Sequence, residues 1–282
     1  MKKPIILIGS PRSGTTLIGD ILNQHPSIAY WIEPKYIWKY KKPILFNDIR
    51  GKDEADNDVK NYIRSKFSQY LIRQNKSRFL EKTPSNCFRI PFINEIFNDA
   101  IFINIIRDGR DAILSSYIKW TTKHDKTAYK RRLTYNEIPL IDFPFYFVNF
   151  IKQLLLQEIK PNYVKQWGPM TPKIREYAKN SILEACAIQW KLCTEISINH
   201  LNDINPSRVY NFKYEDFLIN PEKILNDIHK HCELDPSGEV YEYANSIIRP
   251  QNTKKWQKSH NKKIVEEISY IIDPTLEKLG YK

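Results

Sequence analysis

The feature that most constrains the fold of this chain is a loop rich in glycine and hydroxyl residues near its start. The loop, Gly9–Thr16 (GSPRSGTT), follows the apolar run Ile5–Gly9, and the residues from Thr15 to about Gln24 suit a helix. A continuous apolar run is typical of a buried strand in a parallel sheet. Backbone N–H groups converge where such a strand turns into a helix N-terminus, and they form an anion site there. The pattern therefore predicts an α/β protein with an oxyanion bound after its first strand.

Further apolar runs alternate with helical patterns along the chain. Strands are expected at Ile28–Trp31, Arg78–Leu80, Ala100–Ile106 and Arg208–Phe212. Helices are expected at Thr15–Gln24, Asn57–Arg73, within Pro84–Asn98, and at Gly109–Lys119, Ser181–Leu201, Pro221–Cys232 and Lys262–Ile272. This alternation favours a parallel β-sheet flanked by helices. We expect residues 1–282 to form one domain, with 120–180, rich in aromatic, basic and proline residues, as an inserted, mostly helical cap.

The loop copies the spacing of a Walker A phosphate loop with one change. Thr15 stands where the lysine that reaches the terminal phosphates of ATP is expected. Arg12, earlier in the loop, supplies a cation instead. The loop therefore suits one compact anionic group better than a magnesium-bound triphosphate. An ordinary turn without a ligand stays open as an alternative, because glycine and hydroxyl residues are common in turns.

A second candidate anion site follows the strand Ala100–Ile106. Arg107 comes at its carboxyl end, where ligands gather in open α/β sheets, and guanidinium groups hold phosphate with paired hydrogen bonds. Ser115, about two helical turns later, can reach the same group. Asp108 and Asp111 are flanked by arginines, which makes a divalent cation site unattractive. Salt bridging at a helix start is the alternative interpretation.

Composition narrows the partners and the compartment. Lysine plus arginine outnumber the acids 44 to 32, a net charge of +12 that favours anionic partners. The 4 cysteines form no C-x-x-C pair, which favours reduced thiols in the cytoplasm. No apolar run is long enough to span a bilayer, and Ser10–Arg12 interrupts the first one, so we expect no membrane insertion. His229 and His231, on the expected helix, point to different sides and favour no metal site.

Taken together, the motifs resemble those of sulfotransferases that use 3′-phosphoadenosine-5′-phosphosulfate (PAPS). Pro11–Thr16 is similar to the family's 5′-phosphosulfate loop, and Arg107–Asp111 with Ser115 is similar to its 3′-phosphate motif. Glu81–Pro84 (EKTP) resembles a segment of the carbohydrate-type branch. Lys254–Trp256 and Leu279–Tyr281 resemble the closing nucleotide loop and the C-terminal signature. The resemblance implies a P-loop-like fold, PAPS as co-substrate, adenosine 3′,5′-bisphosphate (PAP) as product, and no metal.

The resemblance also implies which residues bind the donor. They are Pro11, Arg12, Ser13, Gly14, Thr15, Thr16, Arg107, Ser115, Lys254, Lys255 and Trp256. Two positions depart from the family pattern. The family often has proline where Gly109 stands, and the closing loop lacks the Arg-Lys-Gly of the cytosolic small-molecule branch, which weakens the assignment of Lys254 and Lys255.

The implied reaction is an in-line transfer of a sulfuryl group to an acceptor hydroxyl, and it needs a base. Glu33 matches the position of a catalytic glutamate in similar carbohydrate-type enzymes, with His25 and His260 as rivals. Arg12 and Lys82 are expected to stabilise charge on the leaving phosphate. The cap is expected to form part of the acceptor site, and the EKTP segment favours a carbohydrate or other small-molecule acceptor.

Other classes of function remain open on the sequence. A P-loop nucleotide kinase is disfavoured by Thr15 and by the arginines beside Asp108. A protein that binds nucleic acid would suit the net charge, but the basic residues are scattered and no recognition motif is present. A non-catalytic relative that only binds nucleotide would carry no distinguishing residue.

Overall fold

The fold is described from a computed structural model, in which residues 2–43, 47–122, 148, 167–250 and 253–282 are described. At its centre lies a five-stranded sheet in which every pairing is parallel and the order is β2-β3-β1-β4-β5. The strands are β1 (Ile5–Ile8), β2 (Ile28–Ile32), β3 (Arg78–Lys82), β4 (Ile101–Ile106) and β5 (Val209–Lys213). The parallel sheet expected from the apolar runs is confirmed.

Because β1 lies between β3 and β4, the loop after it opens at the middle of the sheet's carboxyl edge. The register pairs Leu7 with both Lys82 and Ile103, so β1, β3 and β4 end close to one level. All four residues of β1 are buried, as a strand covered on both faces requires. The order of the strands thus brings the two candidate anion loops to neighbouring strand ends.

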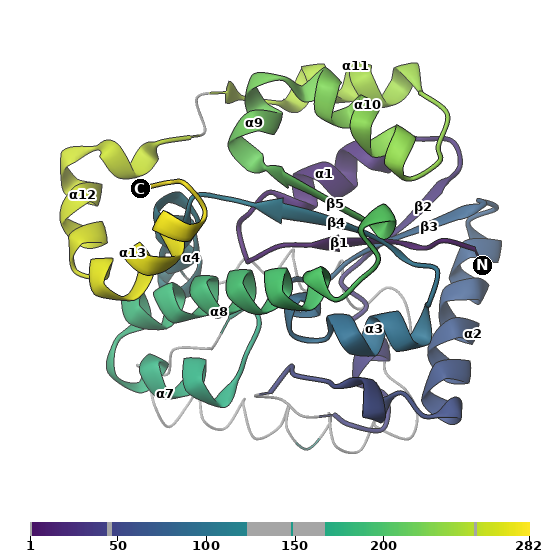
Figure 1. The fold of residues 1–282 in the computed structure, drawn as a ribbon, viewed down its shortest axis with the longest axis horizontal. Coiled ribbons are helices and arrows are strands. Elements are labelled where there is room, and N and C mark those ends of the chain that lie inside the picture. The colour runs from purple at the N-terminus through teal and green to yellow at the C-terminus, as the bar shows by residue number, and fades with distance from the viewer. Residues whose placement is uncertain (1, 44–46, 123–147, 149–166, 251–252) are drawn as a thin grey trace.

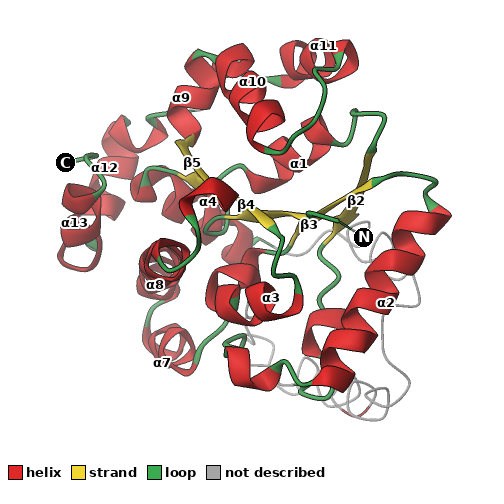
Figure 2. Cartoon of the chain, turned by 45° about the vertical axis from the view of Figure 1, so that its right-hand side comes forward, coloured by secondary structure: helices red, strands yellow, loops and turns green. Residues whose placement is uncertain are grey.

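Helices cover both faces of the sheet (Figures 1 and 2). One face is covered by α1 (Thr15–Leu22), α9 (Tyr214–Ile219), α10 (Pro221–His231) and α11 (Gly238–Ile247), which share an apolar core with Ile5 and Leu7. The alternate residues Ile6 and Ile8 point to the other face, against α2 (Asn57–Arg73) and α3 (Ile90–Ile96). Strand periodicity therefore divides β1 between two cores.

A third core joins the helices beside the carboxyl edge. It contains α4 (Gly109–Thr121), α8 (Ile182–Asn202) and α13 (Ser269–Lys278), with α7 (Pro172–Asn180) packed below α8 (Figure 1). Helix α12 (Ser259–Glu266) contributes Val265. The described residues also include short 3-10 helices, which are η1 (Ile37–Lys39), η2 (Lys52–Glu54), η3 (Pro84–Phe88), η5 (Pro206–Arg208) and η7 (Lys255–Gln257).

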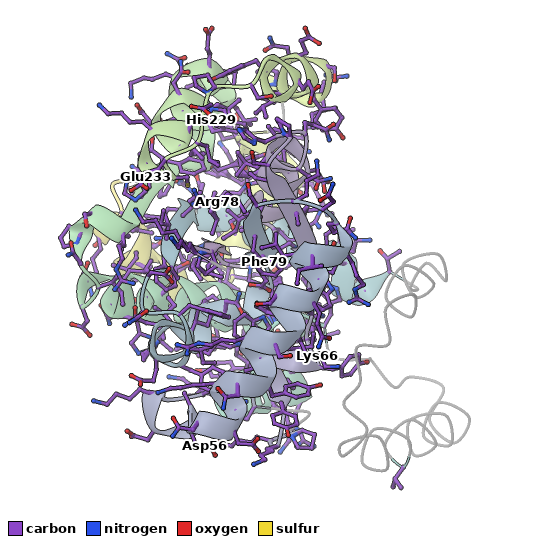
Figure 3. The ribbon with its side chains drawn as sticks, turned by 90° about the vertical axis from the view of Figure 1, so that its right-hand side faces the viewer. Asp56, Lys66, Arg78, Phe79, His229 and Glu233 are labelled. Carbon is purple, nitrogen blue, oxygen red and sulfur yellow. The ribbon has the colours of Figure 1, made fainter. Side chains whose placement is uncertain are left out.

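The amphipathic helix expected at Asn57–Arg73 has those bounds. Asp56 caps it by accepting a hydrogen bond from the Val59 N–H at 2.8 Å, and Figure 3 shows Asp56 at one end of this helix. Val59, Ile63 and Phe67 recur at helical spacing and are buried. Figure 3 also shows Phe79 of β3 behind the helix, in the same core.

Three expectations need correction. The segment Lys262–Ile272 is not one helix: α12 ends at Glu266 and α13 begins at Ser269, because Ile268 turns inward and is buried at the break. The last strand was expected to be buried, but β5 is an edge strand in which Phe212 alone is buried. The pattern also missed α9 and α11, which are too short to show a clear apolar repeat.

Most of the expected cap, 120–180, lies outside the described residues. Within this range, residues 167–170 are described, and hydrogen bonds anchor them. The Trp120 and Gln189 side chains donate to the Trp167 carbonyl at 2.7 and 3.0 Å. Asp48 accepts a bond from the Met170 N–H at 2.8 Å. These contacts fix residues 167–170 beside the carboxyl edge of the sheet. No helix among the described residues is long and apolar enough to cross a membrane.

Candidate active site

A cavity of about 220 Å³ lies at the carboxyl edge of the sheet. It brings together residues that follow all five strands. Its lining comprises Pro11, Arg12, Gly14, Thr15, Thr16, Leu17, Glu33, Lys82, Pro84, Arg107, Trp167 and Tyr214. Four charged side chains expected in the site, Arg12, Glu33, Lys82 and Arg107, thus meet in one cavity although they are far apart in the sequence.

The loop after β1 is built to present backbone N–H groups. The Ser13 side chain is fully buried and donates to the Ser10 carbonyl at 2.7 Å, which closes the turn. Gly14 begins α1 with a φ of 95°, and no side chain among the described residues caps the helix there. The Ser13 N–H also donates to the Ser10 carbonyl, at 3.1 Å. The buried Thr15 would therefore meet an anion through its backbone N–H, whereas the exposed Thr16 can also offer its hydroxyl.

Gly14 is needed for a second reason, which is the ring of Tyr214. A Cβ atom at position 14 would lie 2.4 Å from that ring, and the left-handed φ is itself unfavourable for other residues. Tyr214 follows β5 and packs between the loop and Arg107, whose guanidinium carbon lies 4.5 Å from the ring centre. The ring of Tyr214 therefore packs against both candidate anion-binding sites, the loop at Gly14 and the guanidinium of Arg107.

The two arginines of the candidate anion sites are in direct contact. Arg107 Nη1 donates to the Arg12 carbonyl at 2.7 Å, and Arg12 Nε donates to Ser115 Oγ at 2.9 Å. Partial desolvation and the positive charge of Arg107 lower the pKa of Arg12, although a guanidinium stays charged at any physiological pH. Two like charges held this close favour an anion between or beside them.

The carboxylate of Glu33 lies between two ammonium groups. Lys82 Nζ is 2.9 Å from Oε1 and Lys35 Nζ is 3.1 Å from Oε2. The Lys82 side chain is only 4% exposed, whereas that of Lys35 is 39% exposed. Glu33 adopts a left-handed φ of 54°, and its N–H donates to the Lys82 carbonyl at 2.9 Å, which extends the β2–β3 pairing by one residue.

Glu81, the strand neighbour of Lys82, points away from the cavity into the protein. It is fully buried, and its carboxyl group accepts bonds from Trp38, Thr83 and Asn86. Burial raises the pKa of the Glu81 carboxyl, against the opposing effect of these donors. The EKTP segment therefore has two roles: Glu81 anchors the chain, and Lys82 with Pro84 lines the cavity.

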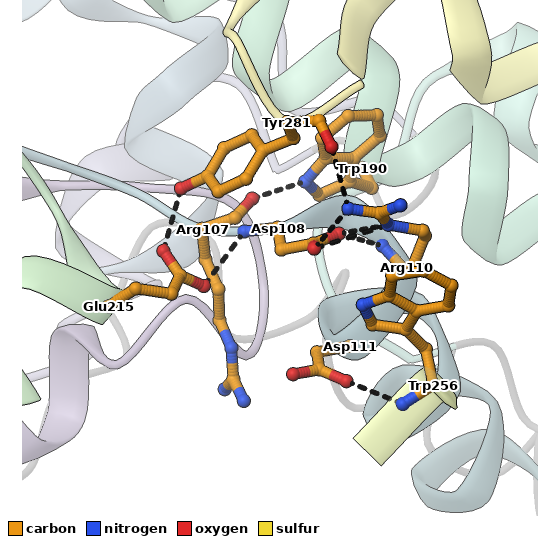
Figure 4. Close-up of polar contacts among 8 residues, drawn as sticks. All are labelled: Arg107, Asp108, Arg110, Asp111, Trp190, Glu215, Trp256 and Tyr281. Atoms are coloured by element: carbon orange, nitrogen blue, oxygen red, sulfur yellow. Dashed lines mark hydrogen bonds and ion pairs between the residues drawn. The ribbon is translucent and has the colours of Figure 1, made fainter. Parts of the chain in front are cut away.

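The Lys254–Trp256 segment does not contribute to this lining. It lies against the start of α4, where the Trp256 N–H donates to Asp111 Oδ1 at 3.0 Å (Figure 4). The indole of Trp256 stacks on Arg110, with 3.8 Å from the guanidinium carbon to the ring centre. Lys254 and Lys255 are exposed. The segment therefore lies close to the Arg107–Asp111 motif, and its contact with the nucleotide stays a prediction.

The two acidic residues of that motif are already engaged. Asp108 forms an ion pair with Arg110 at 2.7 Å, and Asp111 is buried against the Trp256 backbone. Burial raises the pKa of Asp111. Among the residues that the structure describes, no group of three or more histidine, cysteine or acidic side chains is placed to hold a metal ion.

The two rival bases lie elsewhere. His25 is 3% exposed, accepts a bond from the Ser27 N–H at 3.1 Å and contacts the Asp235 carbonyl at 2.9 Å through Nε2. These two bonds use both ring nitrogens, so His25 has a structural role. His260 is exposed on α12, and neither histidine belongs to the described lining of the cavity.

Four further lining residues were missed by sequence reasoning: Leu17, Pro84, Trp167 and Tyr214. The position of Tyr214 immediately after the last strand is a usable signal, because the other site residues also follow strands. Trp167 has no such signal. Its carbonyl is held by the Trp120 and Gln189 side chains, which fixes it beside the cavity.

Comparison with known proteins identifies relatives of this chain. Residues 4–140 match the model of a family described as the sulfotransferase family. The chain is 20% identical to protein-tyrosine sulfotransferase A of Caenorhabditis elegans, over 99% of this chain and 67% of that protein. It is 25% identical to nodulation protein NoeE of Sinorhizobium fredii over 36% of this chain, which spans 28% of that protein.

Solved structures with the same fold are also sulfotransferases. The sulfotransferase domain of the curacin biosynthetic pathway gives a TM-score of 0.56 at 12% identity, covering 95% of this chain and 98% of that one. A sulfotransferase from Mycobacterium avium gives 0.55 at 13% identity, covering 98% and 76%. At these identities the likeness concerns the fold. The family match over residues 4–140 and these solved structures agree that this chain is similar to sulfotransferases.

Proposed function

We propose that this enzyme transfers a sulfuryl group from PAPS to a hydroxyl of a carbohydrate acceptor. One observation carries the proposal: the Glu33–Lys82 ion pair and the Arg12–Arg107 contact line the same cavity. A carboxylate can accept the acceptor's proton, and the cations can stabilise the departing phosphate. The cavity thus offers both kinds of charge that sulfuryl transfer needs.

The acceptor hydroxyl gives its proton to the Glu33 carboxylate while its oxygen forms a bond to sulfur. The bond between sulfur and the bridging phosphate oxygen breaks, and that oxygen keeps the electron pair as part of PAP. Arg12, Lys82 and the N–H groups of the loop neutralise the charge that develops there.

The donor's second phosphate is proposed to bind at Arg107 and Ser115. Ser115 accepts a bond from Arg12, so the two phosphate sites share one network. Trp256, stacked on Arg110 next to this motif, is proposed to cover the nucleotide with Lys254 and Lys255. The step needs no metal, because the guanidinium groups and Lys82 supply the positive charge.

The acceptor is proposed to stack on Trp167 and the neighbouring Pro84. Both line the cavity beside Glu33, and an indole or proline ring offers a flat apolar surface to the C–H face of a sugar. The named relative from C. elegans is a tyrosine sulfotransferase, so tyrosine peptides form the second group in an acceptor screen. A cytoplasmic location is part of the proposal, supported by four buried cysteines that are unpaired.

A P-loop kinase is the alternative that the geometry disfavours. Position 15 is a threonine, and the one carboxylate among the described lining residues, Glu33, is paired with two lysines. Such a carboxylate is poorly suited to hold magnesium beside a triphosphate.

The variant Glu33→Gln tests the base. The amide cannot accept the acceptor's proton, so we expect sulfuryl transfer to fall at least about a hundredfold, the usual range for a general base. The affinity for PAP should change little, because Glu33 is not proposed to touch the phosphates. Transfer from labelled PAPS to a glycan mixture and calorimetric binding of PAP measure the two effects separately.

Glu95→Gln is the matched control, since it also breaks an ion pair with lysine, at 2.6 Å, but on the surface far along the chain. It should leave both transfer and binding unchanged. Undiminished transfer by Glu33→Gln would refute the assignment of the base, and loss of transfer together with PAP binding would indicate a structural role.

A further inference from the structure

Tyr281 follows α13 and reaches across to two other elements of the site. Its hydroxyl donates to Glu215 Oε2 at 2.7 Å, and the other oxygen of Glu215 accepts the backbone N–H of Asp108 at 3.1 Å (Figure 4). Asp108 is the residue immediately after Arg107. A hydrogen-bonded path therefore runs from Tyr281 to the backbone that carries the candidate phosphate-binding arginine.

A second path connects the same elements through Arg110. Its Nη2 donates to the Tyr281 carbonyl at 2.9 Å, and the same guanidinium forms an ion pair with Asp108 at 2.7 Å (Figure 4). Tyr281, Glu215, Asp108 and Arg110 thus form a closed ring of polar contacts. A closed ring restricts each member more than a single bond does, because no contact can lengthen alone.

Glu215 is also placed to influence the other side of Arg107. Its chain neighbour is Tyr214, whose ring lies under the Arg107 guanidinium and against Gly14. The Arg107 carbonyl accepts a bond from Trp190 Nε1 at 3.4 Å. The fixed carboxylate of Glu215 is therefore a polar anchor for the chain directly after the arginine.

The phenol of Tyr281 remains a donor over the whole physiological pH range. Burial and the neighbouring Glu215 carboxylate raise the pKa of Tyr281. The ring itself packs under Lys213, with 4.5 Å from Nζ to the ring centre. The hydroxyl therefore has one evident role, which is to hold the carboxylate.

We propose that Tyr281 is a positioning residue for the donor site, acting through Glu215 to hold Arg107 toward the cavity. This inference rests on the proposed function, since the affinity for PAP is the quantity that reports whether Arg107 is correctly positioned. Tyr281 is not proposed to touch the donor. It lowers the conformational freedom of the arginine before the donor binds, which improves affinity without a new contact.

The variant Tyr281→Phe tests the inference, because it removes only the hydroxyl. We expect the affinity for PAP to fall about fivefold, the size of effect that the loss of one typical hydrogen bond predicts. The KM for PAPS should rise by a similar factor, and kcat should change less than twofold. Tyr270→Phe is the matched control: this exposed tyrosine on α13 donates to Glu184 at 2.9 Å, away from the site, and its loss should leave PAP binding unchanged.

A double-mutant cycle with Glu215→Gln tests whether Tyr281 acts through the glutamate. If it does, adding Tyr281→Phe to Glu215→Gln should weaken PAP binding no further. Equal PAP affinity in Tyr281→Phe and Tyr270→Phe, or additive losses in the cycle, would overturn the inference.

Should Tyr281→Phe fail to fold, Glu215→Gln alone must still weaken PAP binding about fivefold. If the wild type does not bind PAP, the proposed function fails and the inference with it, whereas normal binding by every variant refutes the inference alone.

Discussion

Two charged residues that line the cavity, Arg12 and Glu33, have a left-handed backbone. Their φ angles are 65° and 54°, a conformation that costs a residue other than glycine roughly 1 kcal/mol or more. Glu33 directly follows β2, Arg12 lies in the loop after β1, and both side chains line the cavity. Strain of this kind persists when the surrounding contacts fix it, and it often marks a functional site.

The lysines on either side of Glu33 allow a sharp test at this scale. Lys82→Ala should lower kcat about a hundredfold, because the ammonium group inside the cavity is proposed to stabilise the leaving phosphate. Lys35→Ala removes an equivalent contact with the same carboxylate but from an exposed position outside the lining. It should change kcat only a few-fold. Steady-state kinetics with PAPS, alongside thermal unfolding of both variants, make the comparison.

Equal losses in the two lysine variants would contradict the proposed role of Lys82, since they would indicate that both lysines merely hold Glu33. A Lys82→Ala protein that is inactive because it is unfolded would count against a catalytic role as well.

At the scale of residues, the sequence predicted the charged side chains of the cavity better than the close contacts between distant side chains. Arg12, Lys82 and Arg107 could be found because charged groups after buried strands are conspicuous. The departure at Gly109 has a reason only in the structure: a Cβ atom there would lie 2.6 Å from the Trp190 ring of α8. Such a contact joins residues 81 positions apart and leaves no local pattern. The same holds for the ring of Tyr214 against Gly14.

At the scale of elements, α10 carries a buried histidine whose protonation is linked to stability. His229 is 1% exposed, contacts the Tyr241 hydroxyl of α11 at 3.1 Å, and lies 5.7 Å from the His25 ring (Figure 3). Burial and the neighbouring His25 lower the pKa of His229 to about 4. The unfolded chain, with an ordinary histidine pKa of about 6.5, therefore binds more protons than the folded chain between these values.

The free energy of unfolding should consequently fall as the pH drops from about 6.5 toward 4, and it should be independent of this group at higher pH. In His229→Gln this slope should be smaller, because the amide does not titrate. His260→Gln, at an exposed position, should retain the slope of the wild type. Urea unfolding at a series of pH values measures the three proteins, and identical slopes in all of them would refute the assignment to His229.

The strands and the long helices were predictable, whereas the helices α9 and α11 were not. The 17 residues of α2 gave a clear apolar repeat, and β1 gave a continuous apolar run. The six residues of α9 are too few to show a period, although this helix carries Glu215. The break between α12 and α13 depends on Ile268 being drawn into the core beside α8, which is a tertiary effect.

At the scale of the whole molecule, the order of the strands explains why the site could be located before its geometry was known. Parallel strands end at one edge, so the loops after β1, β3 and β4 had to be neighbours. The identity of the strand neighbours was not predictable, because every pairing joins segments distant in sequence. The net charge of +12 is compatible with an anionic donor but does not select one.

The most direct test of the account is calorimetric binding of PAP to the wild-type protein in the presence of a chelator. Two arginine-based phosphate sites that need no divalent ion predict one PAP site per chain, with an affinity that the chelator leaves unchanged. ATP with magnesium should bind at least about tenfold more weakly, a difference of about 1.4 kcal/mol. Tighter binding of ATP with magnesium, or no binding of PAP, would contradict the account.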